Sequence, residues 1–233
     1  MQVLTFIGVI ILGGLLNFVL KPGAKIVYKL AVSYLFLALL VSACMWVFYF
    51  AGIKNAVIIK AISFVMSWGG VLGRILLGYL VVYISLALKS SLPEENMRFL
   101  RRLIRTTLIA VSIITGNAFI IATAGKITYL GQMLDFFKQS GYAPWFLYFI
   151  MVAEPLGGLG ILFHFTLKTG PLATACLMFL MLGAVYTHWH NKDPFSDSYA
   201  AVMQFITMSL LLLLYYSEKR AAIKPKDTSI YVI

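Results

Sequence analysis

Charged residues are scarce in this chain of 233 residues: Asp, Glu, Lys and Arg make up 12% of it, and 61% is hydrophobic. A soluble domain carries about 25% charged residues and is about half apolar. The scarcity excludes an ordinary soluble globular protein and predicts an integral membrane protein. Acidic residues are the scarcest, with 8 against 19 basic ones and a net charge of +11. In a membrane protein this excess marks cytoplasmic loops and anionic lipid surfaces, so it predicts no nucleic-acid partner.

Cysteine and N-terminal basic residues are also lacking. Cys44 and Cys176 are the two cysteines, and both fall in apolar runs without the CxxC spacing of a redox pair. They are expected to act as small apolar fillers. No basic residue precedes the first apolar run, whereas a cleavable signal peptide begins with a positive segment. We therefore expect an uncleaved first helix with its N-terminus outside.

Several chemistries found in helical membrane proteins lack the residues they need. The last apolar run, 199–216, has no lysine to hold a retinal. Membrane haem usually requires paired histidines at one depth, but His164 lies at the predicted inner side and His188 and His190 at the outer side. No central histidine is present to activate a buried serine. The sequence thus excludes these three readings and predicts no intrinsic cofactor.

What the chain does have is a series of long apolar runs separated by Pro, Gly and charged residues. About 20 apolar residues cross a bilayer as a helix. The runs predict an all-α, polytopic transmembrane bundle of seven spans at residues 3–20, 30–52, 61–88, 105–123, 143–164, 171–187 and 199–216.

The distribution of Lys and Arg predicts the orientation and the division of the chain. With the N-terminus outside and the C-terminus inside, 13 of the 19 basic residues fall in inner segments and 5 in outer ones, as the positive-inside rule requires. The predicted parts are a three-helix membrane region (1–89), a basic cytoplasmic linker (90–104), a four-helix membrane domain (105–216) and a basic cytoplasmic tail (217–233). Apolar residues at helical spacing also predict a short amphipathic helix over 127–139, in the outer interface.

Two charges stand near the middle of predicted spans, Arg74 and Glu154. A charge at bilayer depth is costly, so it usually meets a partner, a cavity or a ligand. Glycines four residues on either side of Arg74, and Gly157 and Gly158 beside Glu154, would open space on the same helix faces. We therefore expect an intramembrane polar pocket around Arg74 and Glu154.

Three interpretations of these charges remain open from the residues alone. Arg74 and Glu154 form a structural ion pair; or they line a pocket for a polar-headed lipophilic ligand such as a quinone; or they do not meet. An outer rim of His188, His190, Asp193 and Asp197 is a further candidate, as a solvated interface, a docking surface or a metal site. Its loose HxH spacing argues against metal.

Residues 105–216 resemble the DoxX family of small membrane proteins. The resemblance rests on Gly125-Lys126, on the segment 141–144 (Gly-Tyr-Ala-Pro), on Glu154 with its glycines, and on the run 178–184 leading to His188. It implies a four-helix bundle and, in some members, a membrane subunit of a thiosulfate–quinone oxidoreductase or an accessory partner of oxidoreductases. It also implies that Lys126 and Glu154 occupy recurring polar positions.

The functional expectation is a membrane subunit or accessory partner of a quinone-linked oxidoreductase in a bacterial-type cytoplasmic membrane. Its candidate ligand-binding residues are Arg74, Glu154, Lys126 and Asn117. Its expected partners are membrane lipids and a redox protein, and quinone is the expected ligand. A small-molecule or proton-coupled transporter, a lipid-binding protein and a scaffold with a buried ion pair are the alternatives.

Overall fold

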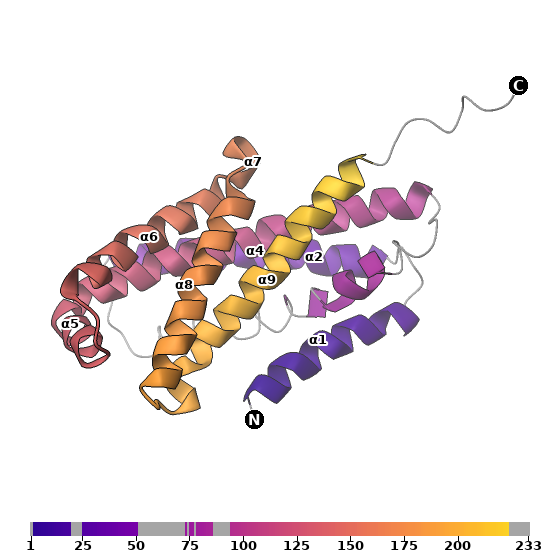
Figure 1. The fold of residues 1–233 in the computed structure, drawn as a ribbon. Coiled ribbons are helices and arrows are strands. Elements are labelled where there is room, and N and C mark those ends of the chain that lie inside the picture. The colour runs from indigo at the N-terminus through magenta and orange to yellow at the C-terminus, as the bar shows by residue number, and fades with distance from the viewer. Residues whose placement is uncertain are drawn as a thin grey trace, which may run out of the picture. The chain divides into compact units, whose positions relative to one another are not determined.

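The computed structural model describes residues 2–19, 25–50, 73, 75–76, 78–85 and 94–223. This part of the chain consists of helices and short turns, with no strand (Figure 1). The helices are α1 (Gln2–Val19), α2 (Lys25–Phe50), α4 (Glu94–Thr128), α5 (Leu130–Gln139), α6 (Pro144–Leu162), α7 (His164–Leu167), α8 (Gly170–His190) and α9 (Phe195–Ile223). The predicted all-α fold class is confirmed.

Five of the described helical segments are long and apolar enough to cross a membrane, which makes the protein multi-pass. They are Lys25–Cys44, Glu95–Thr128, Pro144–Leu162, Gly170–His190 and Phe195–Lys219. The first predicted run, 3–20, is also a helix, α1. The run 61–88 lies mostly outside the described residues, so the number seven and the orientation stay predictions.

Helix α4 begins at Glu94, well before the predicted span at 105. Most of the stretch predicted as a linker is therefore helical. Arg98, Arg101, Arg102 and Arg105 are all exposed, and their spacing places them on one helix face. Leu103 and its apolar neighbours are buried on the opposite side. The arginines lower the mean hydropathy of this segment. Hydropathy alone therefore does not reveal that the segment is an amphipathic helix.

The chain separates into two compact units that interleave along the sequence. Unit 1 contains Met1–Leu37, Lys54–Ile109 and Leu213–Ile233, and unit 2 contains Ala38–Ile53 and Ala110–Leu212. Parts of α2, α4 and α9 contribute to each unit. The predicted linear division into domains stays a prediction.

In unit 1, tyrosine side chains are part of a mostly aliphatic described core. Tyr79 and Tyr83 are almost fully buried, their rings are 5.7 Å apart, and the ring of Tyr83 also lies 6.4 Å from Phe99 at the start of α4. A Cβ added to Gly73 would lie 2.5 Å from the Tyr34 hydroxyl oxygen, so a larger residue there would require the Tyr34 ring to shift. Arg74, the next residue, lies outside the described residues.

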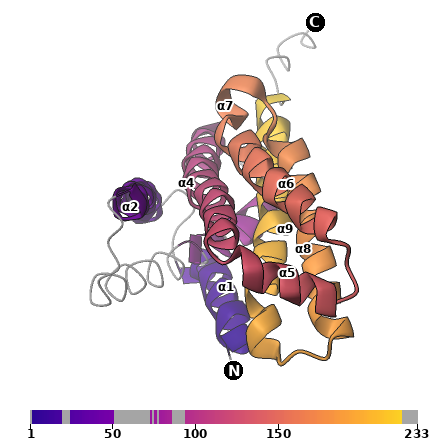
Figure 2. The same ribbon diagram turned by 90° about the vertical axis from the view of Figure 1, so that its left-hand side faces the viewer.

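In unit 2, small residues let α6 approach both of its neighbours. A Cβ on Gly158 would lie 2.6 Å from the carbonyl oxygen of Gly116 on α4, and one on Gly157 would lie 2.6 Å from Leu177 on α8. Close backbone approach at small residues is the usual way in which membrane helices associate. Helix α5 connects α4 to α6 and packs against α6 (Figure 2).

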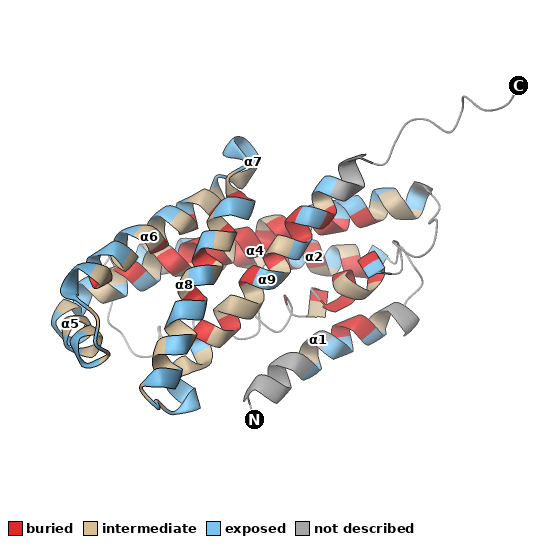
Figure 3. Cartoon of the chain, in the orientation of Figure 1, coloured by how far each residue is buried: buried red, intermediate tan, exposed pale blue. Residues whose placement is uncertain are grey.

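The outer surface of α6 and α8 is apolar while the charge of α6 is buried. Trp145, Phe149, Val152 and Leu156 are each at least half exposed, whereas Glu154 is 4% exposed. Figure 3 shows the exposed and buried positions interleaved along both helices. Exposed apolar side chains and a buried charge are the reverse of a soluble protein. They suit a helix whose outer face meets lipid and whose polar group faces protein.

Candidate functional site

The site is built around Glu154, which projects from the middle of α6 toward α4. Its Oε2 atom accepts a hydrogen bond from Lys126 Nζ at 2.7 Å. Thr123 Oγ1 lies 3.3 Å from the same oxygen and 3.2 Å from the carbonyl oxygen of Phe119, so its single proton is shared between the two acceptors. Thr123 and Lys126 are three residues apart on α4, so a single helix face presents both donors. The close contact of Gly116 with Gly158 holds the two helices near enough for this pairing.

The ion pair between Lys126 and Glu154 is buried unequally. The lysine side chain is 20% exposed and the glutamate side chain 5%. Desolvation of such a pair is costly, and attraction at short range offsets it only when the geometry is good and further hydrogen bonds are made. Thr123 supplies a share of one such bond, because its proton also has the Phe119 carbonyl oxygen as an acceptor. The Oε1 atom of Glu154 receives no hydrogen bond from any described residue, and two of the three Lys126 donors are likewise unused.

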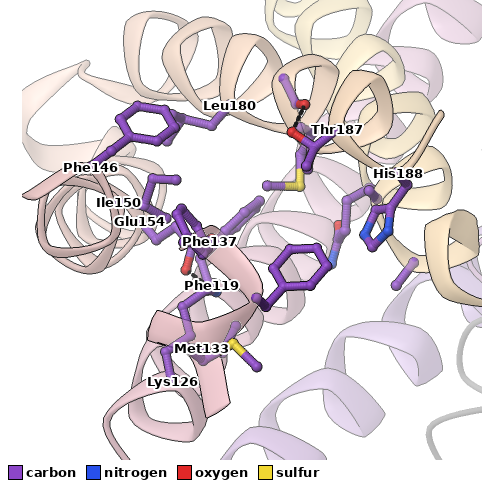
Figure 4. Close-up of a pocket in the computed structure, with 18 of the residues that line it drawn as sticks. Phe119, Lys126, Met133, Phe137, Phe146, Ile150, Glu154, Leu180, Thr187 and His188 are labelled. Carbon is purple, nitrogen blue, oxygen red and sulfur yellow. Dashed lines mark hydrogen bonds and ion pairs between the residues drawn. The ribbon is translucent and has the colours of Figure 1, made fainter. Parts of the chain in front are cut away.

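A cavity of about 570 Å³ lies beside this pair, within unit 2. Residues of α4, α5, α6, α8 and α9 line it, and Lys126 and Glu154 form part of the wall (Figure 4). Pockets for small molecules usually measure about 300–1,000 Å³ and combine an apolar wall with a few polar groups. The cavity has a volume within this range and a mostly apolar wall with a few polar groups.

Several aromatic rings line the cavity, among smaller and aliphatic side chains. Its aromatic rings come from α4, α5, α6, α8 and the α5–α6 turn: Phe119, Phe136, Phe137, Phe146, Phe179 and Tyr142. The rings of Phe137, Tyr142 and Phe146 contact one another, with centroids 5.2–6.1 Å apart. Gly183 and Ala184 on α8 also line the cavity and leave room in it. The interior suits a planar apolar ligand with a polar group.

A second polar group lines the other side of the cavity. His188, near the end of α8, places its Nδ1 2.8 Å from Asp193 Oδ2. The hydroxyl groups of Tyr142 and Thr187 are 2.8 Å apart and share a hydrogen bond. Figure 4 shows Thr187 and His188 across the cavity from Lys126 and Glu154.

The structure brings together some of the residues selected from the sequence and separates others. Glu154 and Lys126 are in direct contact, and both line the cavity with His188 and Asp197. His190 and Asp193 do not line it. Arg74 is outside the described residues, so the three interpretations of its relation to Glu154 stay open, while the partner that the structure does describe for Glu154 is Lys126.

Asn117 occupies a different environment from the other candidates. Its Oδ1 accepts a hydrogen bond from Trp46 Nε1 at 2.7 Å, and its Nδ2 donates to Ile113 O at 2.8 Å and to Ser42 Oγ at 3.3 Å. It therefore ties α4 to the C-terminal part of α2 within unit 2. Asn117 does not line the cavity.

Sequence reasoning missed the aromatic wall and the role of α5. The amphipathic helix predicted over 127–139 is confirmed as α5 (Leu130–Gln139), but it was expected only to lie in the interface. Met133, Phe136 and Phe137 on α5 line the cavity. Their spacing of three and four residues marks one helix face, which was the available signal.

Comparison with known proteins supports the resemblance deduced from the sequence. Residues 110–213 match the model of the DoxX-like family. The matched segment nearly coincides with the continuous part of unit 2, Ala110–Leu212, which holds the cavity. No curated protein and no solved structure matched the chain.

Proposed function

We propose that this multi-pass membrane protein, through its DoxX-like segment, binds a lipophilic ligand with an oxygen-bearing aromatic head, such as a quinone. The ligand occupies the cavity of unit 2. The protein acts there as a membrane subunit or accessory partner of a quinone-linked oxidoreductase.

The observation that carries the proposal is a buried ion pair at the cavity wall in which some hydrogen-bonding groups have no partner among the described residues. Glu154 is 4% exposed, yet its Oε1 has no described donor while Oε2 has two. A purely structural ion pair is most stable when every lone pair and proton is satisfied. A ligand that supplies the missing partner completes the network.

A quinone has groups that match both the aromatic and the polar parts of the cavity wall. Its ring stacks or packs edge-on against aromatic side chains such as Phe119 and Phe146. A carbonyl oxygen can accept a hydrogen bond from Lys126 Nζ, and a hydroxyl of the reduced form can donate one to Glu154 Oε1. The remaining apolar surface of the cavity suits an alkyl chain.

The proposed redox partnership rests on the family resemblance. Some DoxX-like proteins are membrane subunits or accessory partners of oxidoreductases, as the resemblance implies. A chain that binds quinone beside such a partner would position the ring and supply hydrogen bonds. The partner would hold the redox cofactor.

A direct test is binding of decyl-ubiquinone to the full-length protein in lipid nanodiscs. Gly183 lines the cavity, and a Cβ there would meet nothing within 4 Å, so Gly183→Leu should fill the space without disturbing the helices. We expect this variant to lose detectable binding. Gly131→Leu is the matched control, because Gly131 is equally unobstructed but does not line the cavity.

The polar wall is tested with Glu154→Gln and the reduced probe, decyl-ubiquinol, kept under anaerobic conditions. We expect about tenfold weaker binding, because the hydroxyl of the reduced form loses its charged acceptor, Oε1. Asp135→Asn, an exposed acidic residue outside the cavity, is the control. Unaltered binding in Gly183→Leu would place any ligand elsewhere and refute the proposal. Proton-coupled uptake of a solute that disappears in Glu154→Gln would favour the transporter instead.

A further inference from the structure

The His188–Asp193 pair gives the cavity a second polar end. Nδ1 of His188 lies 2.8 Å from Asp193 Oδ2, and the two side chains are 21% and 24% exposed. Asp193 is fixed in turn, since its backbone N–H donates to the carbonyl oxygen of His188 at 3.0 Å. The imidazole ring is thus held by the carboxylate of a residue whose backbone is anchored to the end of α8.

This contact decides which ring nitrogen remains for a ligand. A carboxylate that accepts from Nδ1–H places the proton of a neutral imidazole on Nδ1 and leaves the lone pair on Nε2. None of the described residues hydrogen-bonds to Nε2. Because His188 lines the cavity, Nε2 is the nitrogen available to accept a hydrogen bond from an occupant.

The ring of His188 is also held from the side of α5. The ring of Phe136 packs against it with a centroid distance of 5.8 Å, and Phe136 lines the same cavity. The hydroxyls of Tyr142 and Thr187 nearby are hydrogen-bonded to each other, and each oxygen keeps some acceptor capacity. His188 differs from them because Asp193 fixes its ring, and it faces the cavity from across the Lys126–Glu154 pair (Figure 4).

We infer that the cavity recognises the reduced, hydroquinone form of its ligand by both of its hydroxyl groups, with Glu154 Oε1 accepting from one and His188 Nε2 from the other. This rests on the proposed function and deepens it. An aromatic ring with hydroxyls at opposite positions offers one donor to each of two acceptors, and the cavity wall carries Glu154 and His188 on opposite sides. A ligand without the second hydroxyl leaves Nε2 unused.

The charges around His188 also disfavour an anionic head at that end. Asp193 contacts the ring directly, and the carboxylate of Asp197 lines the same cavity. A neutral hydroxyl donor suits this surrounding, and a carboxylate or phosphate does not. Asp193 is thus a positioning residue, which acts through the orientation of His188.

The test compares two probes on the full-length protein in nanodiscs under anaerobic, reducing conditions. The probes are a decyl-substituted hydroquinone and its monomethyl ether, which keeps one hydroxyl for the Glu154 end. We expect wild-type protein to bind the hydroquinone about three- to tenfold more tightly, the value of one hydrogen bond. His188→Ala should bind both probes equally, because the acceptor for the second hydroxyl is gone.

Three further variants separate recognition from folding. His188→Gln, whose amide reaches about as far as Nε2, should restore part of the preference, and it serves if His188→Ala does not fold. Asp193→Ala should reduce the preference by loosening the ring. His190→Ala, an exposed histidine that does not line the cavity, should keep the wild-type preference.

Failure of this inference differs from failure of the proposed function. Equal binding of both probes by wild-type protein, or an unchanged preference in His188→Ala, would overturn two-ended recognition while leaving quinone binding intact. Binding of neither probe and no binding of the oxidised quinone would refute the proposed function itself.

Discussion

Helix α4 carries two buried polar clusters, and they are used in opposite ways. In its second half, Asn117 accepts a hydrogen bond from Trp46 through its amide oxygen and donates to Ser42 and Ile113 through its amide nitrogen. Nine residues further on, Lys126 pairs with a glutamate beside a cavity, and the second oxygen of that glutamate accepts no hydrogen bond from the described part of the chain. The comparison teaches that a buried polar residue in a membrane helix is not by itself a site. Unused hydrogen-bonding capacity next to open space is the more telling feature.

The difference is physical. Inside a membrane protein, polar side chains on neighbouring helices hydrogen-bond to one another because lipid offers no alternative. Asn117 follows this rule completely and becomes a link between α2 and α4. Glu154 follows it only in part, because only its Oε2 atom accepts hydrogen bonds from the described residues. Its Oε1 atom is a charged acceptor whose loss of water is not compensated by such a bond. Asn117 is therefore not part of the site that we propose.

The largest effect that tests this comparison is expected from Lys126→Met. The variant leaves a carboxylate that is 5% exposed without its cation, and breaking a buried pair from one side costs about 3 kcal/mol or more. Thermal or denaturant unfolding in nanodiscs measures the loss. Lys138→Met is the control, because Lys138 is exposed and outside the cavity.

The double variant Lys126→Met/Glu154→Leu sharpens the same point. Removal of both charges should restore most of the stability while quinone binding stays lost, since an apolar pair tolerates burial. Were the double variant to bind quinone like the wild type, the ion pair would have only a structural role.

A smaller effect is expected from Gly158→Ala, which tests whether the close approach of α4 and α6 creates the site. The added methyl group would lie 2.6 Å from the Gly116 carbonyl oxygen, so the helices must move apart. Overpacking of this kind costs about 2 kcal/mol, and it should also weaken quinone binding by separating Lys126 from Glu154. Both are measured on one nanodisc preparation.

Gly125→Ala is the matched control for that prediction. Gly125 is also on α4, but a Cβ there meets nothing within 4 Å. Its replacement should leave stability unchanged or slightly raised, since alanine favours helix over glycine. Equal effects of the two variants would contradict the packing argument.

The smallest effect is expected from Asn117→Leu, which acts on the other half of the comparison. The substitution leaves Trp46 Nε1 and the Ser42 hydroxyl without this partner. Interhelical hydrogen bonds in membranes contribute about 1 kcal/mol in measured cases. Stability should fall by about that amount while the quinone affinity of the folded protein is unchanged. A marked loss of affinity without loss of stability would move Asn117 into the site.

Part of the site could be deduced from the sequence, because the free-energy cost of a charge at bilayer depth marks a residue whatever its neighbours are. Glu154 stands out in its apolar run, and the expense of a charge at that depth marks it without knowledge of its neighbours. Lys126 was reached only through the family resemblance, because it follows the predicted span and reads as an interfacial lysine. Arg74 was selected by the same cost argument as Glu154. Matching depth along two helices, however, does not establish that they are neighbours.

The extent of the helices shows the same limit. The spans at 143–164 and 171–187 agree closely with α6 and α8, because hydropathy alone marks them. Helix α4 starts well before the predicted span at 105, and its first turns were not apparent from hydropathy because exposed arginines on one face accompany a buried apolar face. For α5, the sequence predicted the helix, but only the structure shows that three of its side chains line the cavity.

The sequence by itself determined that this protein is a multi-pass helical membrane protein with a costly carboxylate in one helix, because composition and hydrophobic length act locally along the chain. Only the tertiary structure decided which cation meets that carboxylate, that His188 lies across an aromatic cavity from it, and that Asn117 is engaged elsewhere. These facts depend on which helix faces come together. That choice is made by small residues such as Gly116 and Gly158, whose partners lie far away in the sequence.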